Sequence, residues 1–126
     1  MCNFKMNHLH IICGDLEDMK KFWTEGMGAS FKEDRSFGGA DGTVLELDGL
    51  QINLRVPKES EKAIKLNTNS FGYDHLGLTV DDLDSACAHL AKFGCLIDSG
   101  PTELHDRKLA FLKGPENIIL ELIQIV

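Results

Sequence analysis

The sequence repeats itself at a fixed spacing, and this internal duplication restricts the possible folds more than any other feature. Segments His8–Leu16 and His75–Leu83 share four identical residues at an offset of 67. A second pair of segments, Leu47–Leu54 and Pro115–Leu122, matches at an offset of 68. Two matched blocks at nearly one offset indicate a duplicated structural unit. We therefore expect one unit written twice, with both copies forming a single domain over residues 1–126.

Each repeat is typical of a strand followed by a helix and three further strands. Alternating apolar residues predict the strands, and Asp15 and Asp82 suit helix N-caps because a short carboxylate accepts hydrogen bonds from the first turn. The polar stretch 57–73 is the natural linker. The prediction is an α+β fold of two βαβββ repeats, over about residues 6–56 and 74–126. The expected elements lie at residues 6–13, 15–26, 29–35, 43–48 and 51–56, then at 74–80, 82–93, 95–99, 108–113 and 118–125.

Charge and composition exclude several classes of partner. Lys and Arg number 13 against 20 Asp and Glu, so the net charge of −7 disfavours nucleic acid and anionic membrane surfaces. No apolar run approaches the roughly 18 residues that a membrane span needs, and the N-terminal residues lack the apolar core of a signal peptide. The four cysteines form no Cys-x-x-Cys pair. We expect a cytoplasmic protein with reduced thiols, acting on a small molecule.

The strand pattern places four polar residues on one face of the predicted sheet. Successive side chains of a strand point to opposite faces, so residues that alternate with the apolar, helix-facing positions point away from the helices. These residues are His8, Asn53, His75 and Glu121. In a curved sheet that face is concave, and an unpaired carboxylate there would cost several kcal/mol.

A divalent metal ion would satisfy these polar groups together. Two imidazoles and one carboxylate are a standard ligand set, and an amide oxygen can serve as a fourth ligand. Three protein ligands leave positions for water or substrate, which is typical of a catalytic site. The alternative for a single inward histidine is a hydrogen-bonded core residue. The pairing of His8 with His75, together with Glu121, favours the metal.

Three further residues share the inner face and are candidates for substrate binding. His10 suits either the pocket lining or an outer-shell hydrogen bond to a ligand, because Gly77 stands at the equivalent position of the second repeat. Arg55 suits an anionic substrate group or a structural salt bridge. Gln51 supplies a further amide on the same face.

The chain resembles the glyoxalase, bleomycin-resistance and extradiol-dioxygenase superfamily, also called vicinal oxygen chelate proteins. The resemblance implies an eight-stranded curved mixed sheet, or cup, with helices on its convex side and often a homodimer. It also implies metal ligands at the first and last strand of each repeat. The positions are His8, Asn53, His75 and Glu121, and Asn53 departs from the Glu or Gln of better-known members. The resemblance is carried by Asn7–Ile11 with Asp15 and Leu16, Asp74–Leu78 with Asp82 and Leu83, and Phe111–Asn117 leading into Leu120–Leu122.

The resemblance further implies a metal-dependent lyase or isomerase of a small oxygenated metabolite, similar to lactoylglutathione lyase. The metal would be Zn, Ni, Fe, Mn or Co, with glutathione as a candidate co-substrate. It would chelate two neighbouring substrate oxygens, with Glu121 as ligand and proton shuttle. Two alternatives stay open: a non-haem iron or manganese dioxygenase or thiol transferase, and a resistance protein that sequesters a drug without catalysis. The cup can also be completed across two chains, so His8 and His75 need not serve the same chain's site.

Overall fold

The computed structural model describes residues 2–64 and 70–126, which belong to two compact units, Met1–Ile64 and Lys65–Val126. Unit 1 contains a four-stranded mixed sheet in the order β1-β4-β3-β2, in which β1 runs parallel to β4 and the other pairs are antiparallel. Its elements are β1 (His8–Ile12), α1 (Leu16–Lys21), a π-helical turn (Phe22–Gly26), β2 (Ser30–Phe37), β3 (Ala40–Leu47) and β4 (Leu50–Arg55).

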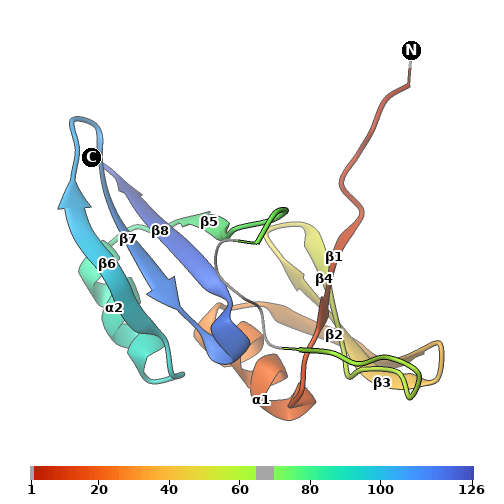
Figure 1. Ribbon diagram of the computed structural model, residues 1–126. Helices are drawn as coiled ribbons and strands as arrows, with labels where there is room; N and C mark the ends of the chain where they lie inside the picture. The colour runs from red at the N-terminus through yellow and green to blue at the C-terminus, as the bar shows by residue number, and fades with distance from the viewer. Residues whose placement is uncertain (1, 65–69) are drawn as a thin grey trace. The chain divides into compact units, whose positions relative to one another are not determined.

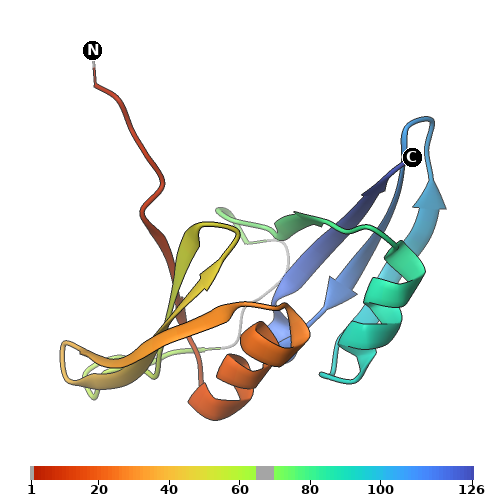
Figure 2. The ribbon, with the colours of Figure 1, turned by 180° about the vertical axis from the view of Figure 1, so that it is seen from behind.

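Unit 2 repeats this plan, and the predicted α+β class with two βαβββ repeats is confirmed. Its sheet has the order β5-β8-β7-β6, again with one parallel pair, β5 with β8. Helix α2 contacts β6, β7 and β8 (Figures 1 and 2). The elements are β5 (Leu76–Thr79), α2 (Leu83–Ala91), β6 (Leu96–Glu103), β7 (Arg107–Lys113), a 3₁₀ turn (Pro115–Asn117) and β8 (Ile119–Ile125).

Both helices begin where the sequence predicts. The Asp15 carboxylate accepts a hydrogen bond from the backbone of Asp18 at 2.9 Å, and Asp82 does the same for Ser85 at 2.8 Å. These contacts satisfy backbone N–H groups that have no partner within the helix. Because each cap follows the first strand of its repeat, the same local signal turns the chain from strand to helix twice.

The last strand of each repeat separates core from inner face by simple alternation. Leu120 and Leu122 are almost completely buried, whereas Glu121 between them is only partly buried. In β4, however, Asn53 is itself 3% exposed, between buried Ile52 and Leu54. The two equivalent positions therefore differ in solvation, and the unit 1 amide is more enclosed than the unit 2 carboxylate.

Several strands run beyond their predicted ends, β6 the furthest. The prediction ended this strand at residue 99, just before Gly100 and Pro101. The structure continues β6 to Glu103, with irregular register between Ser99 and Thr102. Since β6 is an edge strand of its sheet, a proline that cannot donate a hydrogen bond is tolerated there.

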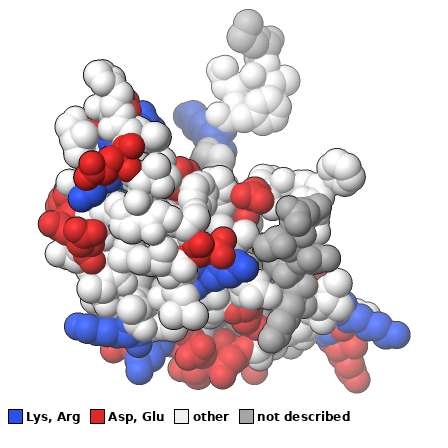
Figure 3. Space-filling view, turned by 60° about the vertical axis from the view of Figure 1, so that its left-hand side comes forward, with Lys and Arg blue, Asp and Glu red and all other residues white. Residues whose placement is uncertain are grey.

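Basic residues do not form a single patch on the face that Figure 3 shows. In Figure 3, Lys and Arg side chains are interspersed with Asp and Glu. Several basic side chains pair with acidic ones, among them Lys32 with Glu46 at 3.1 Å. Among the described residues, every helix is too short or too polar to cross a bilayer.

Candidate functional site

Unit 2 brings together two of the predicted metal ligands. His75 lies directly before β5, and Glu121 lies on the neighbouring parallel strand β8. The His75 Nε2 atom is 3.1 Å from Glu121 Oε1. On the other side of the ring, Nδ1 is 2.7 Å from Asp74 Oδ2. The imidazole is therefore held between two carboxylates from different parts of the chain.

The two carboxylates favour the charged form of this imidazole. A carboxylate only accepts hydrogen bonds, so the protonated ring, with a donor on each nitrogen, suits both neighbours. The hydrogen bond to Asp74 raises the pKa of His75 above its ordinary value, and Glu121 adds to the rise, while partial burial opposes it. Phe111 meets the ring edge-on, with centroids 5.1 Å apart, and restricts its rotation.

In unit 1, His8 has an acceptor oxygen beside Nδ1 as His75 does, and Asn53 stands at the position equivalent to Glu121. His8 begins β1, and its Nδ1 is 2.7 Å from Asn7 Oδ1. Asn53 lies on the parallel neighbour β4, where its Oδ1 accepts a hydrogen bond from Gln51 Nε2 at 3.0 Å. An amide oxygen has two acceptor positions, so one remains after this bond.

His10 contributes an apolar contact to the inner face of unit 1. It lies opposite Asn53 in the β1–β4 register, and its ring packs against Phe37 with centroids 4.6 Å apart. Burial lowers the pKa of His10, and the positive charge of Arg55 lowers it further, so the ring is neutral near pH 7. Gly42 makes room for Phe37, because a Cβ at position 42 would lie 2.5 Å from that ring.

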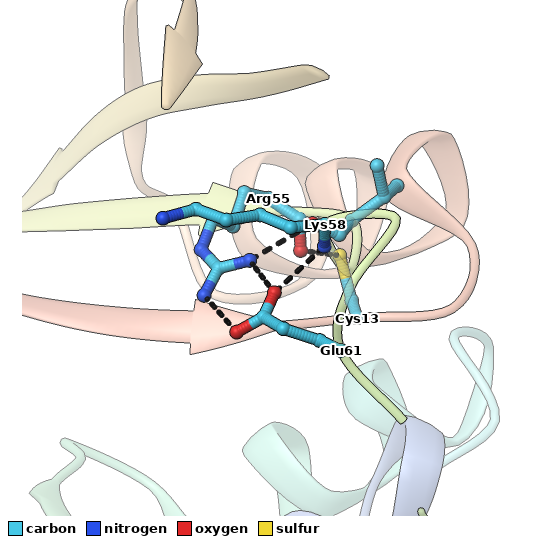
Figure 4. A network of polar contacts seen from close by, with 5 residues as sticks. Cys13, Arg55, Lys58 and Glu61 are labelled. Carbon is cyan, nitrogen blue, oxygen red and sulfur yellow. Dashed lines mark hydrogen bonds and ion pairs between the residues drawn. The ribbon is translucent and has the colours of Figure 1, made fainter. Parts of the chain in front are cut away.

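Arg55 is held by an acidic partner from the chain that follows β4. Its guanidinium donates to both Glu61 carboxylate oxygens, at 2.6 and 3.0 Å, and Glu61 also accepts from the Lys58 backbone at 2.7 Å (Figure 4). The pair lowers the pKa of Glu61 to about 2 and raises that of Arg55. Arg55 therefore serves the structural role that the sequence left open, and an anionic substrate would have to compete with Glu61.

The Arg55–Glu61 pair predicts a pH-dependent contribution to stability. We expect Glu61→Gln to lower the melting temperature at pH 7, because the amide loses the charge that holds Arg55. The folded-state pKa of about 2 lies below the ordinary value of 4.5, so this contribution is present above pH 4.5 and fades as the pH falls toward 2. Thermal unfolding followed by circular dichroism at both ends of this window measures it.

Glu59→Gln is the matched control for this prediction, because Glu59 is exposed two residues earlier in the same segment. It should leave the melting temperature unchanged. Equal melting temperatures for wild type and Glu61→Gln at pH 7 would contradict the structural role of the pair. A difference in melting temperature between wild type and Glu61→Gln that is as large at pH 2 as at pH 7 would also contradict it.

His75 and Glu121 fit a divalent metal ion in donor chemistry and in spacing. Two ligands about 2.0–2.2 Å from one ion, at ligand–metal–ligand angles between octahedral (about 90°) and tetrahedral (about 109°), lie roughly 2.8–3.6 Å apart. The distance of 3.1 Å between His75 Nε2 and Glu121 Oε1 falls in this range. Within the described part of either unit, no three His, Cys, Asp or Glu side chains gather to hold an ion by themselves.

Two residues of the site were not predicted from the sequence, namely Asn7 and Asp74. Each precedes a histidine and provides an acceptor oxygen to its Nδ1. The signal was present, because the two positions are related by the same offset of 67 as the histidines. The two residues differ in type and share only a side-chain acceptor oxygen, so identity between the repeats does not reveal them.

Comparison with known proteins shows which sequences and structures the chain is similar to. The chain is 28% identical over 145 residues to lactoylglutathione lyase from Schizosaccharomyces pombe, covering 98% of this chain and 48% of that protein, so it spans about half of its length. It is 29% identical over 139 residues to a probable lactoylglutathione lyase from Vibrio cholerae, covering 98% and 93%. The crystal structure of a glyoxalase family protein from Bacillus cereus has a TM-score of 0.87 at 16% identity, covering 100% and 97%.

A family model matches the chain over most of its length. The match runs over residues 5–122 and so includes both repeats and all four candidate ligands. The description of the matched family names glyoxalases, bleomycin resistance proteins and dioxygenases together. The chain belongs to the Glyoxalase/Bleomycin resistance protein/Dioxygenase superfamily.

Proposed function

We propose that this protein is a metal-dependent lyase or isomerase of a small oxygenated metabolite, similar to lactoylglutathione lyase. The observation that carries the proposal is the His75–Glu121 contact of 3.1 Å, with a second His at the equivalent position of the other repeat. The relatives in S. pombe and V. cholerae, named lactoylglutathione lyase and probable lactoylglutathione lyase, support the same reaction class.

In this proposal the ligands come from both repeats. His8 and His75 bind through Nε2, Glu121 binds through its carboxylate, and Asn53 is a weak ligand or a donor to substrate. The bound ion would act as a Lewis acid that polarises a substrate carbonyl and makes the adjacent C–H acidic. Glu121 then removes and returns a proton on one side of the substrate, because its equivalent, Asn53, has no basic oxygen.

The charges near the inner face bear on the choice of substrate. Arg55 pairs with Glu61, and Arg107, which lies near enough to Glu121 to interact with its charge, pairs with Asp106. A strongly anionic substrate would compete with these partners in a protein of net charge −7. We therefore propose a substrate of low charge. Assays with and without glutathione show whether it is a co-substrate.

A turnover assay with defined metals tests the proposed function. The protein is stripped with a chelator, reloaded with Zn, Ni, Co, Mn or Fe, and supplied with methylglyoxal, with and without glutathione. We expect turnover with at least one metal and its loss on chelation. Oxygen consumption with catechols, supported by iron or manganese alone, would overturn the lyase in favour of a dioxygenase. Tight ligand binding without metal and without turnover would favour a sequestering protein.

A further inference from the structure

The residue before each candidate histidine contacts the ring nitrogen that faces away from the proposed metal. Asn7 Oδ1 and His8 Nδ1 are 2.7 Å apart, and Asp74 Oδ2 and His75 Nδ1 are also 2.7 Å apart. The two contacts lie in separate units and involve different residue types. The same contact therefore arises twice from different side chains, and the property that Asn7 and Asp74 share is an acceptor oxygen.

An acceptor at Nδ1 determines which nitrogen can bind a metal. A neutral imidazole carries one proton, and the nitrogen without it is the one that can ligate. In water the proton prefers Nε2, which would block ligation at that atom. A hydrogen bond from Nδ1 to a fixed oxygen reverses this preference and leaves the Nε2 lone pair free.

His75 shows the competition between the two nitrogens directly. Asp74 lies 2.7 Å from Nδ1, whereas Glu121 lies 3.1 Å from Nε2. The shorter contact favours Nδ1 as the position of the single proton on the neutral ring. The Nε2 lone pair then lies beside the Glu121 carboxylate, so that both can bind the same metal ion. Without Asp74, Glu121 would draw the proton to Nε2.

We propose that Asn7 and Asp74 are positioning residues that hold His8 and His75 in the Nδ1–H form, so that both Nε2 atoms are ready for a divalent metal. This inference rests on the proposed function, in which the two histidines are ligands. The acceptor oxygen is the essential feature rather than the charge, because Asn7 is neutral and because the Asp74 side chain is 70% exposed, where solvent screens its charge.

Substitutions that keep or remove the acceptor separate these features. Asp74→Asn and Asn7→Asp keep an oxygen within reach of Nδ1 and change only the charge. Asp74→Ala and Asn7→Ala remove the oxygen. Asp81→Ala is the control, because Asp81 is an exposed aspartate beyond the other end of β5.

The first measurement is the ring ¹⁵N spectrum of the metal-free protein, at a pH where the imidazoles are neutral, with signals assigned through His8→Gln and His75→Gln. We expect Nδ1–H for both rings in wild type and in the two acceptor-keeping variants. Asp74→Ala should move the His75 proton to Nε2, and Asn7→Ala should move that of His8. Nε2–H in wild type, or no change on removal of the acceptor, would overturn the inference.

The second measurement is the affinity for Zn²⁺ by calorimetry. Removing either acceptor should weaken binding about 10–100-fold, whereas Asp74→Asn and Asp81→Ala should bind like wild type. If Asp74→Ala and wild type bind Zn²⁺ with equal affinity, the inference is overturned and the proposed function is not. An Asp74→Asn variant as weak as Asp74→Ala would also overturn it, because the charge would then be what matters. Wild type that binds no divalent metal would overturn the proposed function itself.

Discussion

Replacing Glu121 with Gln is expected to abolish turnover while the fold stays intact. The substitution keeps the size of the side chain and removes both the metal-binding charge and the proposed base. Loss of a general base costs about 10²–10⁴-fold in rate, and a lost ligand weakens metal binding more than the 10–100-fold typical of an outer-shell partner. Steady-state kinetics and Zn²⁺ calorimetry measure the two effects on one preparation.

The control for this substitution is Glu103→Gln, the same chemical change on exposed β6 of the same unit. It should retain wild-type turnover and metal affinity. Thermal unfolding should be nearly the same for all three proteins, because Glu121 is only partly buried. Wild-type turnover in Glu121→Gln would remove Glu121 from the mechanism.

Replacing Leu122, the residue after Glu121, should lower stability and leave metal binding unchanged. Leu122 is 1% exposed and belongs to the core face of β8. We expect Leu122→Ala to lower the free energy of unfolding by about 2–5 kcal/mol, because the lost burial and the remaining cavity both destabilise the protein. Denaturant unfolding measures this change, and metal affinity at temperatures where the variant is folded should remain close to wild type.

Ile125→Ala is the matched control on the same strand, because Ile125 is 59% exposed. Its effect on stability should be small. If Ile125→Ala cost as much as Leu122→Ala, the assignment of the core face would be wrong. The contrast between Glu121 and Leu122 also tests the alternation on which the candidate site depends, since neighbouring residues should affect either chemistry or stability but not both.

Much of the fold was predictable because its signals are local and occur twice. Asp15 and Asp82 cap their helices through their own first turns, so no distant residue is needed to position them. Strand alternation likewise depends on immediate neighbours and placed His75 and Glu121 on one face. Their contact at 3.1 Å depends on the parallel pairing of β5 with β8, which the structure shows.

The features that the sequence did not settle depend on non-local packing. The continuation of β6 past Pro101 is possible because the strand lies at the sheet edge, which a pattern of residues does not reveal. The pairing of Arg55 with Glu61 depends on a fold-back of the polar segment after β4, which was expected to be a solvent-exposed linker. The burial of Asn53, and its bond from Gln51, also depend on the surrounding strands.

The most direct test of the central claim is a crystal structure of the metal-loaded protein with anomalous diffraction at the metal absorption edge. The account predicts one strong peak bound by Nε2 of His8, Nε2 of His75 and the carboxylate of Glu121, at the roughly 2.0–2.2 Å typical of nitrogen and oxygen ligands. These three ligands come from one chain or from a pair of chains. A peak at other residues, or a peak that touches only one of the two histidines, would contradict it.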